Sequence, residues 1–122
     1  MSAGGISIHA VNVATGRPAE GLRVRLSRET AADRVLIAEG HCGKSGLFED
    51  PSVEGAGIIA GRYVAEFFIG DFIATSSNAT TEAAVGFLDV AVFPFILSDP
   101  AQHYHLPLKF TAWGYSLFRG GL

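Results

Sequence analysis

The chain has 122 residues, of which 48% are hydrophobic and 17% are charged, and this composition excludes a disordered protein, which needs low hydrophobicity and high charge. The formal net charge is -3 and the lysine and arginine residues are scattered, so we expect no nucleic-acid partner. A single cysteine, Cys42, excludes an intrachain disulfide framework and fits a reducing compartment.

Neither a secretion signal nor a membrane helix is expected. Residues 1–5 carry no basic side chain and lead directly into a strand pattern. The longest apolar runs lie near residues 83–97, where Glu82, Asp89 and Pro94 interrupt them, whereas a membrane helix needs about 20 apolar residues. We therefore expect a cytoplasmic protein with no membrane partner.

Strand patterns follow one another along the chain. Residues 6–13 mix β-branched residues with small and polar ones, and the turn sequence of residues 15–18 ends them. Apolar residues alternate with arginines in residues 22–26, which predicts that the leucines and the valine face a core and the arginines face solvent. Further strands are predicted over residues 34–39, 62–69, 89–97, 103–110 and 113–118.

One short helix is predicted over residues 78–87, because its alanines and Glu82 favour helix and Asn78 can cap its start. Pro94 restricts its own strand to a sheet edge or a bulge. About eight short strands with turns between them and one helix predict an all-β fold, an antiparallel two-sheet sandwich. No repeat or linker is visible, so we expect one domain over residues 1–122.

The histidines are the candidate chemical groups. His9 lies in the first strand pattern, and His103 and His105 are two residues apart, so in a strand they project from one face. Because a histidine titrates at about pH 6.5, a pair can divide the roles of base and acid. The same pattern also fits half of a metal site or a plain surface feature. No third ligand cluster accompanies it, so we expect no metal and no other cofactor.

Two sequence features have plain interpretations. The tripeptide Gly43-Lys44-Ser45 resembles the end of a phosphate-binding loop, but Ala38 stands where that motif needs a glycine. Cys42 follows a histidine, but the sequence places no second histidine or carboxylate to activate it. We expect an unreactive loop thiol.

Several longer motifs occur in order along the chain. Residues 9–19 begin with His, two apolar residues and Asn, and end with Gly-Arg-Pro-Ala. Gly-Arg-Tyr opens a later strand at residues 61–63, and residues 103–108 read His-Tyr-His-Leu-Pro-Leu. Residues 114–121 read Gly-Tyr-Ser-Leu-Phe-Arg-Gly-Gly. These motifs resemble those of the transthyretin and 5-hydroxyisourate hydrolase family over nearly the whole chain.

The resemblance implies a transthyretin-like sandwich of two four-stranded sheets with one short helix. It also implies a homotetramer, a dimer of dimers, with active sites in the channel where the dimers meet. The family's reaction opens a ring of 5-hydroxyisourate, a small cyclic purine derivative, by attack of water on a carbonyl. Carried over to this sequence, the catalytic pair is His9 and His105, which activate the water and transfer protons.

The resemblance further implies substrate-binding positions, several of which depart from the family pattern. Leu47 stands where the family has the arginine of an Asp-Gly-Arg turn, and loss of one such electrostatic group lowers turnover by about 10²–10³. Lys44 is a poor substitute for an arginine that binds through two hydrogen bonds. The family's terminal Tyr-Arg-Gly-Ser becomes Phe-Arg-Gly-Gly, followed by Leu122, so both hydroxyls are lost and the pocket becomes less polar. The predicted substrate-binding residues are Leu47, His103, Phe118, Arg119, Gly120 and Gly121.

Three functions fit these observations. The departures, above all Leu47, favour a divergent enzyme of the family, which uses His9 and His105 to hydrolyse, isomerise or cyclise a different and less charged small cyclic substrate. The alternative enzyme is a true 5-hydroxyisourate hydrolase of purine catabolism that tolerates the substitutions. The third function is non-catalytic binding of a small ligand, as in transthyretin, against which the retained histidine pair argues.

Overall fold

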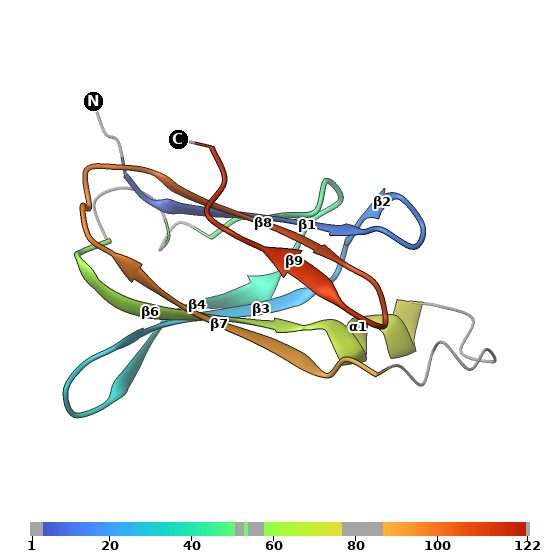
Figure 1. Ribbon diagram of the computed structural model, residues 1–122, viewed down its shortest axis with the longest axis horizontal. Coiled ribbons are helices and arrows are strands. Elements are labelled where there is room, and N and C mark those ends of the chain that lie inside the picture. The colour runs from blue at the N-terminus through green and yellow to red at the C-terminus, as the bar shows by residue number, and fades with distance from the viewer. Residues whose placement is uncertain (1–3, 51–52, 54–57, 77–86, 122) are drawn as a thin grey trace.

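The computed structural model describes residues 4–50, 53, 58–76 and 87–121, and Figure 1 shows two β-sheets stacked face to face with one helix at one end. The first sheet has the order β2-β1-β8-β9, with β5 also paired to β1, and the second has the order β4-β3-β6-β7. The strands of the first sheet are β1 (Ile6–Asn12), β2 (Arg17–Pro18), β5 (Leu47–Phe48), β8 (Tyr104–Phe110) and β9 (Tyr115–Leu117). Those of the second are β3 (Arg23–Glu29), β4 (Arg34–His41), β6 (Gly61–Phe68) and β7 (Val90–Leu97), and α1 spans Ile69–Ser76.

The predicted two-sheet sandwich is confirmed, with nine strands in the described part of the chain. All its strand pairs are antiparallel except one: β1 and β8 run parallel over their whole length. Two neighbouring parallel strands need a long connection between them. The chain between β1 and β8 includes the whole second sheet. The parallel pair lies at the centre of the first sheet.

The core lies between the sheets and follows the alternation that the sequence predicted. In β3, Val24 and Leu26 are completely buried, whereas the arginines that alternate with them face outward. Those arginines, Arg23 and Arg25, form ion pairs with Glu39 and lie over the ring of Phe68. Two-residue alternation thus separates an apolar core face from a charged solvent face.

Helix α1 follows directly after β6 and was not predicted: the sequence predicts a strand over residues 62–69 and no element over residues 70–76. Most of its residues, which include two isoleucines, a glycine and an aspartate, are weak helix formers. Packing stabilises it instead: Ile69 and Ile73, one turn apart, are buried, and Phe72 meets Phe110 edge to face. The helix predicted over residues 78–87 lies, except for Phe87, outside the described residues.

The position of Pro94 agrees with its prediction. It lies in β7, which forms one end of the second sheet and pairs with β6. A strand at a sheet edge can accommodate proline, because one side of its backbone has no neighbouring strand to bond.

Candidate functional site

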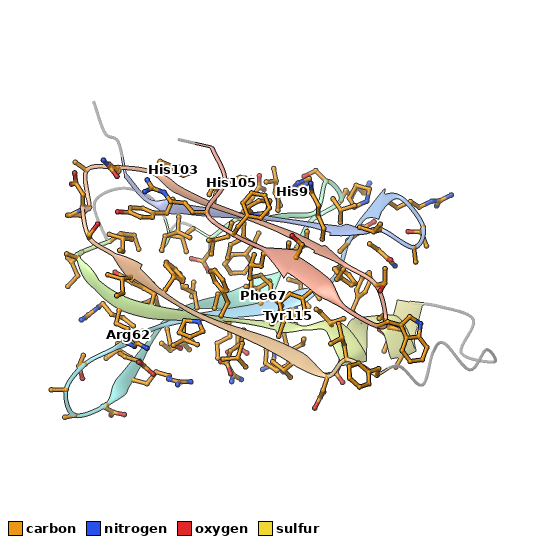
Figure 2. The ribbon with its side chains drawn as sticks, viewed as in Figure 1. His9, Arg62, Phe67, His103, His105 and Tyr115 are labelled. Atoms are coloured by element: carbon orange, nitrogen blue, oxygen red, sulfur yellow. The ribbon has the colours of Figure 1, made fainter. Side chains whose placement is uncertain are left out.

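The candidate residues lie on the outer face of the first sheet. Burial alternates along β1, so its isoleucines face the core while Ser7 and His9 face outward. Because β1 and β8 run parallel in register, Ser7 lies beside His105. Figure 2 shows His9, His103 and His105 grouped on this sheet. Two strands that are distant in sequence therefore bring the histidines together.

A tight turn before β5 holds the ring of His9. Its Nε2–H donates a hydrogen bond of 2.8 Å to the carbonyl oxygen of Ser45. Gly46 adopts a φ of 83°, and a Cβ there would lie 2.4 Å from the carbonyl oxygen of Ala10, so only glycine fits. Since a carbonyl only accepts, Nε2 carries a proton and Nδ1 is the nitrogen of His9 that can accept another.

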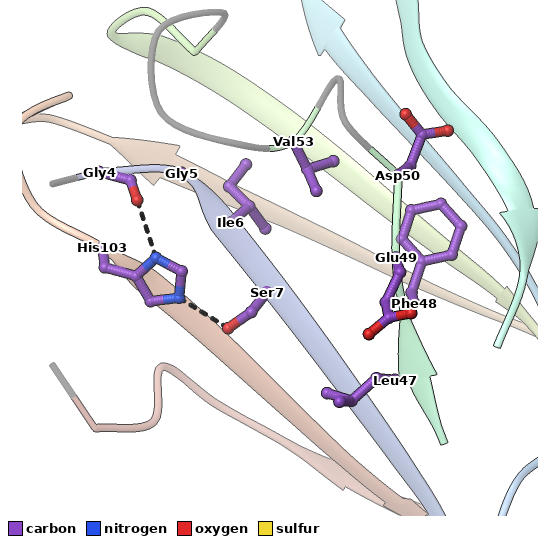
Figure 3. A pocket seen from close by; sticks show the side chains of 10 residues that line it. All are labelled: Gly4, Gly5, Ile6, Ser7, Leu47, Phe48, Glu49, Asp50, Val53 and His103. Carbon is purple, nitrogen blue, oxygen red and sulfur yellow. Dashed lines mark hydrogen bonds between the residues drawn. The ribbon is translucent and has the colours of Figure 1, made fainter. Parts of the chain in front are cut away.

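Ser7 links the two histidines of the His-Tyr-His motif. Its Oγ lies 2.7 Å from Nε2 of His103 and 2.7 Å from Nδ1 of His105, within hydrogen-bonding distance of both. The other ring nitrogen of His103, Nδ1, donates a hydrogen bond of 2.8 Å to the carbonyl oxygen of Gly4, as Figure 3 shows. His103 therefore contacts the site through Ser7.

The environment of His105 favours its neutral form. Partial burial, first of all, and the proximity of His103 and His9 hold the pKa of His105 below its usual value of 6.5. Burial and neighbouring positive charge both disfavour the imidazolium ion. At neutral pH the ring of His105 is accordingly neutral.

Leu47 lies next to His9, since the two residues pair in the ladder between β5 and β1. It is partly buried and lines a pocket of about 330 Å³, shown in Figure 3, together with Ser7, His103 and Glu49. His9 and His105 are not among the residues that line this pocket, which adjoins the histidine pair through Ser7 and Leu47.

Arg119 attaches the C-terminal segment to the start of β8. Its Nη2 donates to the side-chain oxygen of Gln102 at 3.2 Å and to the carbonyl oxygen of His103 at 3.3 Å. The guanidinium carbon lies 4.0 Å from the centroid of the Tyr104 ring, a cation–π contact. The charge of Arg119 is thus engaged by the protein itself.

Gly120 brings the C-terminal segment against His105. Its N–H donates a hydrogen bond of 2.6 Å to the carbonyl oxygen of His105. A Cβ on Gly120 would lie 2.9 Å from Cδ2 of His105 and 3.1 Å from Cδ of Pro107. By contrast, Phe118 is 47% exposed, and a Cβ on Gly121 would meet no atom within 4 Å.

Most predicted site residues gather around one patch, which also contains two residues that the sequence did not predict, Ser7 and Glu49. Ser7 could have been found, because it lies two positions before His9 and so shares its face. Glu49 carried no local signal, since its place depends on how β5 packs on β1. The predicted residues brought together are His9, Leu47, His103, His105 and Gly120, while the side chain of Arg119 binds Gln102 and the backbone of His103.

The thiol of Cys42 agrees with the prediction of an unreactive group. It is buried, and this burial raises its pKa to about 12. Among the residues that the structure describes, no three His, Cys, Asp or Glu side chains are grouped as metal ligands, and no helix is long and apolar enough to span a membrane.

Comparison with known proteins identifies the family. The sequence model described as "HIUase/Transthyretin family" matches residues 6–120. A curated relative from Rhizobium meliloti, named 5-hydroxyisourate hydrolase 2, is 35% identical over 117 residues, which are 96% of this chain and 96% of that protein. The chain belongs to the HIUase/transthyretin family, in which its curated relatives are named as hydrolases.

Solved structures agree with this assignment. The 5-hydroxyisourate hydrolase of Klebsiella pneumoniae is 28% identical with a TM-score of 0.78, over 99% of this chain and 100% of that one. An (S)-allantoin synthase is 29% identical with a TM-score of 0.85, and this chain spans 44% of its length. The transthyretin-like fold implied by the sequence motifs is confirmed.

Proposed function

We propose that this protein is a hydrolase that opens a small cyclic substrate of the 5-hydroxyisourate type, with His9 and His105 as its acid–base pair. The observation that carries the proposal is the placement of both rings on one outward face, each with one nitrogen available for a proton. The likeness to curated 5-hydroxyisourate hydrolases over almost the whole chain supports the reaction class.

In the proposed reaction His105 is the base. Its neutral ring takes a proton from water as the water oxygen attacks a ring carbonyl carbon of the substrate. The ring C–N bond then breaks, and the leaving nitrogen receives a proton from Nδ1 of protonated His9, whose Nε2–H stays bonded to Ser45. Water is thereby added across the C–N bond, and positioned acid–base groups accelerate such a step by about 10²–10⁴.

Leu47 supports a substrate altered from 5-hydroxyisourate. It lies beside His9, where the family motif has an arginine, and its side chain offers neither a positive charge nor a hydrogen bond. A cyclic amide or imide with less negative charge suits such a surface better than an anion. We therefore place true 5-hydroxyisourate hydrolysis second, as the activity that the relatives' names indicate.

The test is the decay of the ultraviolet absorbance of freshly generated 5-hydroxyisourate, with and without protein. Acceleration that His105→Ala and His9→Ala abolish supports hydrolysis by the histidine pair and favours the second-placed substrate. The altered substrate is supported if the wild type does not accelerate this decay but hydrolyses an uncharged cyclic imide, and if the same two variants abolish that hydrolysis. If both variants keep every activity of the wild type, the acid–base pair is wrong.

We further propose that residues 1–122 form a single domain that assembles as a homotetramer, a dimer of dimers. The exposed outer face of the first sheet, which carries the histidines, is the surface that a second dimer would cover in this arrangement. Sedimentation velocity tests this assembly. A single species with the mass of one 12.9 kDa chain would contradict the tetramer and any pocket formed between subunits.

A further inference from the structure

A continuous chain of hydrogen bonds runs from the N-terminal end of β1 to His105. It begins at the carbonyl oxygen of Gly4, which accepts from Nδ1 of His103 at 2.8 Å. Nε2 of the same ring lies 2.7 Å from Oγ of Ser7, and that oxygen lies 2.7 Å from Nδ1 of His105. The chain ends at Nε2 of His105.

The chemistry of each group fixes the direction of this chain. A carbonyl oxygen only accepts, so Nδ1 of His103 carries a proton, and at a pH where the ring is neutral its Nε2 holds a lone pair. That lone pair requires the hydroxyl of Ser7 to donate to it. A hydroxyl has one proton, so Oγ of Ser7 can then only accept from Nδ1 of His105. Nδ1 of His105 therefore carries its proton, and Nε2 of His105 holds the lone pair.

We propose that Ser7 is a positioning residue, which together with His103 selects the tautomer of His105 that has Nε2 free to act as the base. The tautomer follows from the hydrogen bonds alone, and its effect on turnover rests on the proposed function. We call the hydrogen-bonded chain Gly4–His103–Ser7–His105 the relay. The carbonyl of Gly4 sets its direction, because a carbonyl oxygen can only accept a hydrogen bond. A histidine base needs such a partner, since the hydrogen bond at one ring nitrogen determines which nitrogen is reactive.

The position of Ser7 allows its hydroxyl to be removed without disturbing the core. The side chain lies on the outer face of β1, and the neighbours of Ser7 in the strand, Ile6 and Ile8, fill the core instead. Ser7→Ala should accordingly fold with an unchanged melting temperature. Ser7→Thr keeps the hydroxyl, and threonine is favoured in strands. Ser116→Ala, at an exposed serine of β9 outside the relay, is the matched control.

The experiment is NMR of the full-length protein labelled with ¹⁵N in its histidines, at a pH where the rings are neutral, with His105→Gln to assign the signals. In the wild type, in Ser7→Thr and in Ser116→Ala, we expect His105 to have a protonated Nδ1 and an unprotonated Nε2. In Ser7→Ala the Nε2 signal should move toward the protonated position. A protonated Nε2 in the wild type, or an unchanged tautomer in Ser7→Ala, overturns the relay.

Turnover separates this proposal from the proposed function. On whichever cyclic substrate the wild type hydrolyses, Ser7→Ala should lower kcat roughly tenfold to a hundredfold with a smaller change in KM, and Ser7→Thr should restore it. A changed tautomer with full turnover overturns the positioning role and leaves hydrolysis by the histidine pair intact. If the wild type hydrolyses no cyclic substrate, the proposed function fails, and the tautomer of His105 still tests the relay.

Discussion

Leu47 of β5 lies directly opposite His9 of β1 in their antiparallel ladder. Side chains of paired residues share one face of a sheet, so the residue at position 47 determines the polarity next to the His9 ring. The leucine makes this side of the site apolar. Leu47, which departs from the sequence motif, therefore lies where its side chain can affect which substrates the site accepts.

Leu47→Arg should raise the hydrolysis of 5-hydroxyisourate by up to about 10²–10³, because the guanidinium would stabilise negative charge that develops on the substrate. The measurement is kcat/KM from the absorbance decay. Leu47→Met, which is similar in volume and uncharged, is the control and should change little. Equal rates for Leu47→Arg and Leu47→Met would show that the residue at position 47 does not determine which substrate is hydrolysed.

His9→Ala and His105→Ala should each lower turnover by at least about 10², since each removes one of the two proposed proton-transfer groups. His41→Ala is the matched control, because His41 is exposed at the end of β4 in the other sheet. Single-turnover rates with the active substrate distinguish the three variants. A loss of similar size in His41→Ala would indicate a general effect of removing a histidine.

Gly120→Ala should lower turnover while leaving the fold intact. Its methyl group would come within 2.9 Å of Cδ2 of His105, so the ring or the C-terminal segment must move. Gly114→Ala is the control, because a Cβ there meets no atom within 4 Å. Kinetics and melting temperature together provide the check, and full activity in Gly120→Ala would show that the ring tolerates the displacement.

The acid limb of the pH–rate profile should have its midpoint below pH 6.5. The depressed pKa of His105 keeps the base neutral to lower pH than an ordinary histidine. The profile of kcat/KM reports this group in the free enzyme. A midpoint above 6.5 would contradict His105 as the base.

The lowered pKa of His105 also makes the free energy of unfolding depend on pH, because the folded and unfolded states bind different numbers of protons. Since the folded-state pKa of His105 lies below the unfolded-state value, the unfolded chain binds more protons in the interval between them. The contribution of His105 to stability is therefore complete above about pH 6.5 and is lost as the pH falls through the folded-state pKa. Chemical denaturation over this range, compared with His105→Gln, measures the difference.

Cys42 should resist a water-soluble disulfide reagent at pH 8 in the folded protein and react at once in guanidinium chloride. Burial raises the pKa of its thiol to about 12 and also blocks access, so almost no thiolate is available. Absorbance of the released thiolate counts the reacting groups. Rapid labelling of the native protein would mean that the segment after β4 opens readily.

Local patterns in the sequence were sufficient for seven of the nine strands in the described part of the chain, but not for the two-residue strands β2 and β5. Alternation in residues 22–26 correctly placed Val24 and Leu26 in the core, because one period of two residues decides both faces of a strand. The pattern failed at α1, because the apolar run that predicted a strand ends at Ile69, the first residue of the helix, and the residues after it carry no clear helix signal. There, burial of Ile69 and Ile73 outweighs weak helix propensity, which a local pattern cannot register.

The sequence by itself determined that the strand pattern makes a sandwich, that His9 shares a face with the residue two positions before it, and that His103 and His105 share another. Only the tertiary structure decided that these two faces are one, because β1 and β8 pair in parallel across a separation of 96 residues between Ser7 and His103. Register between distant strands depends on which side chains pack across the whole sheet, and no local spacing encodes it. The hydroxyl of Ser7 acquires two histidine partners through that register.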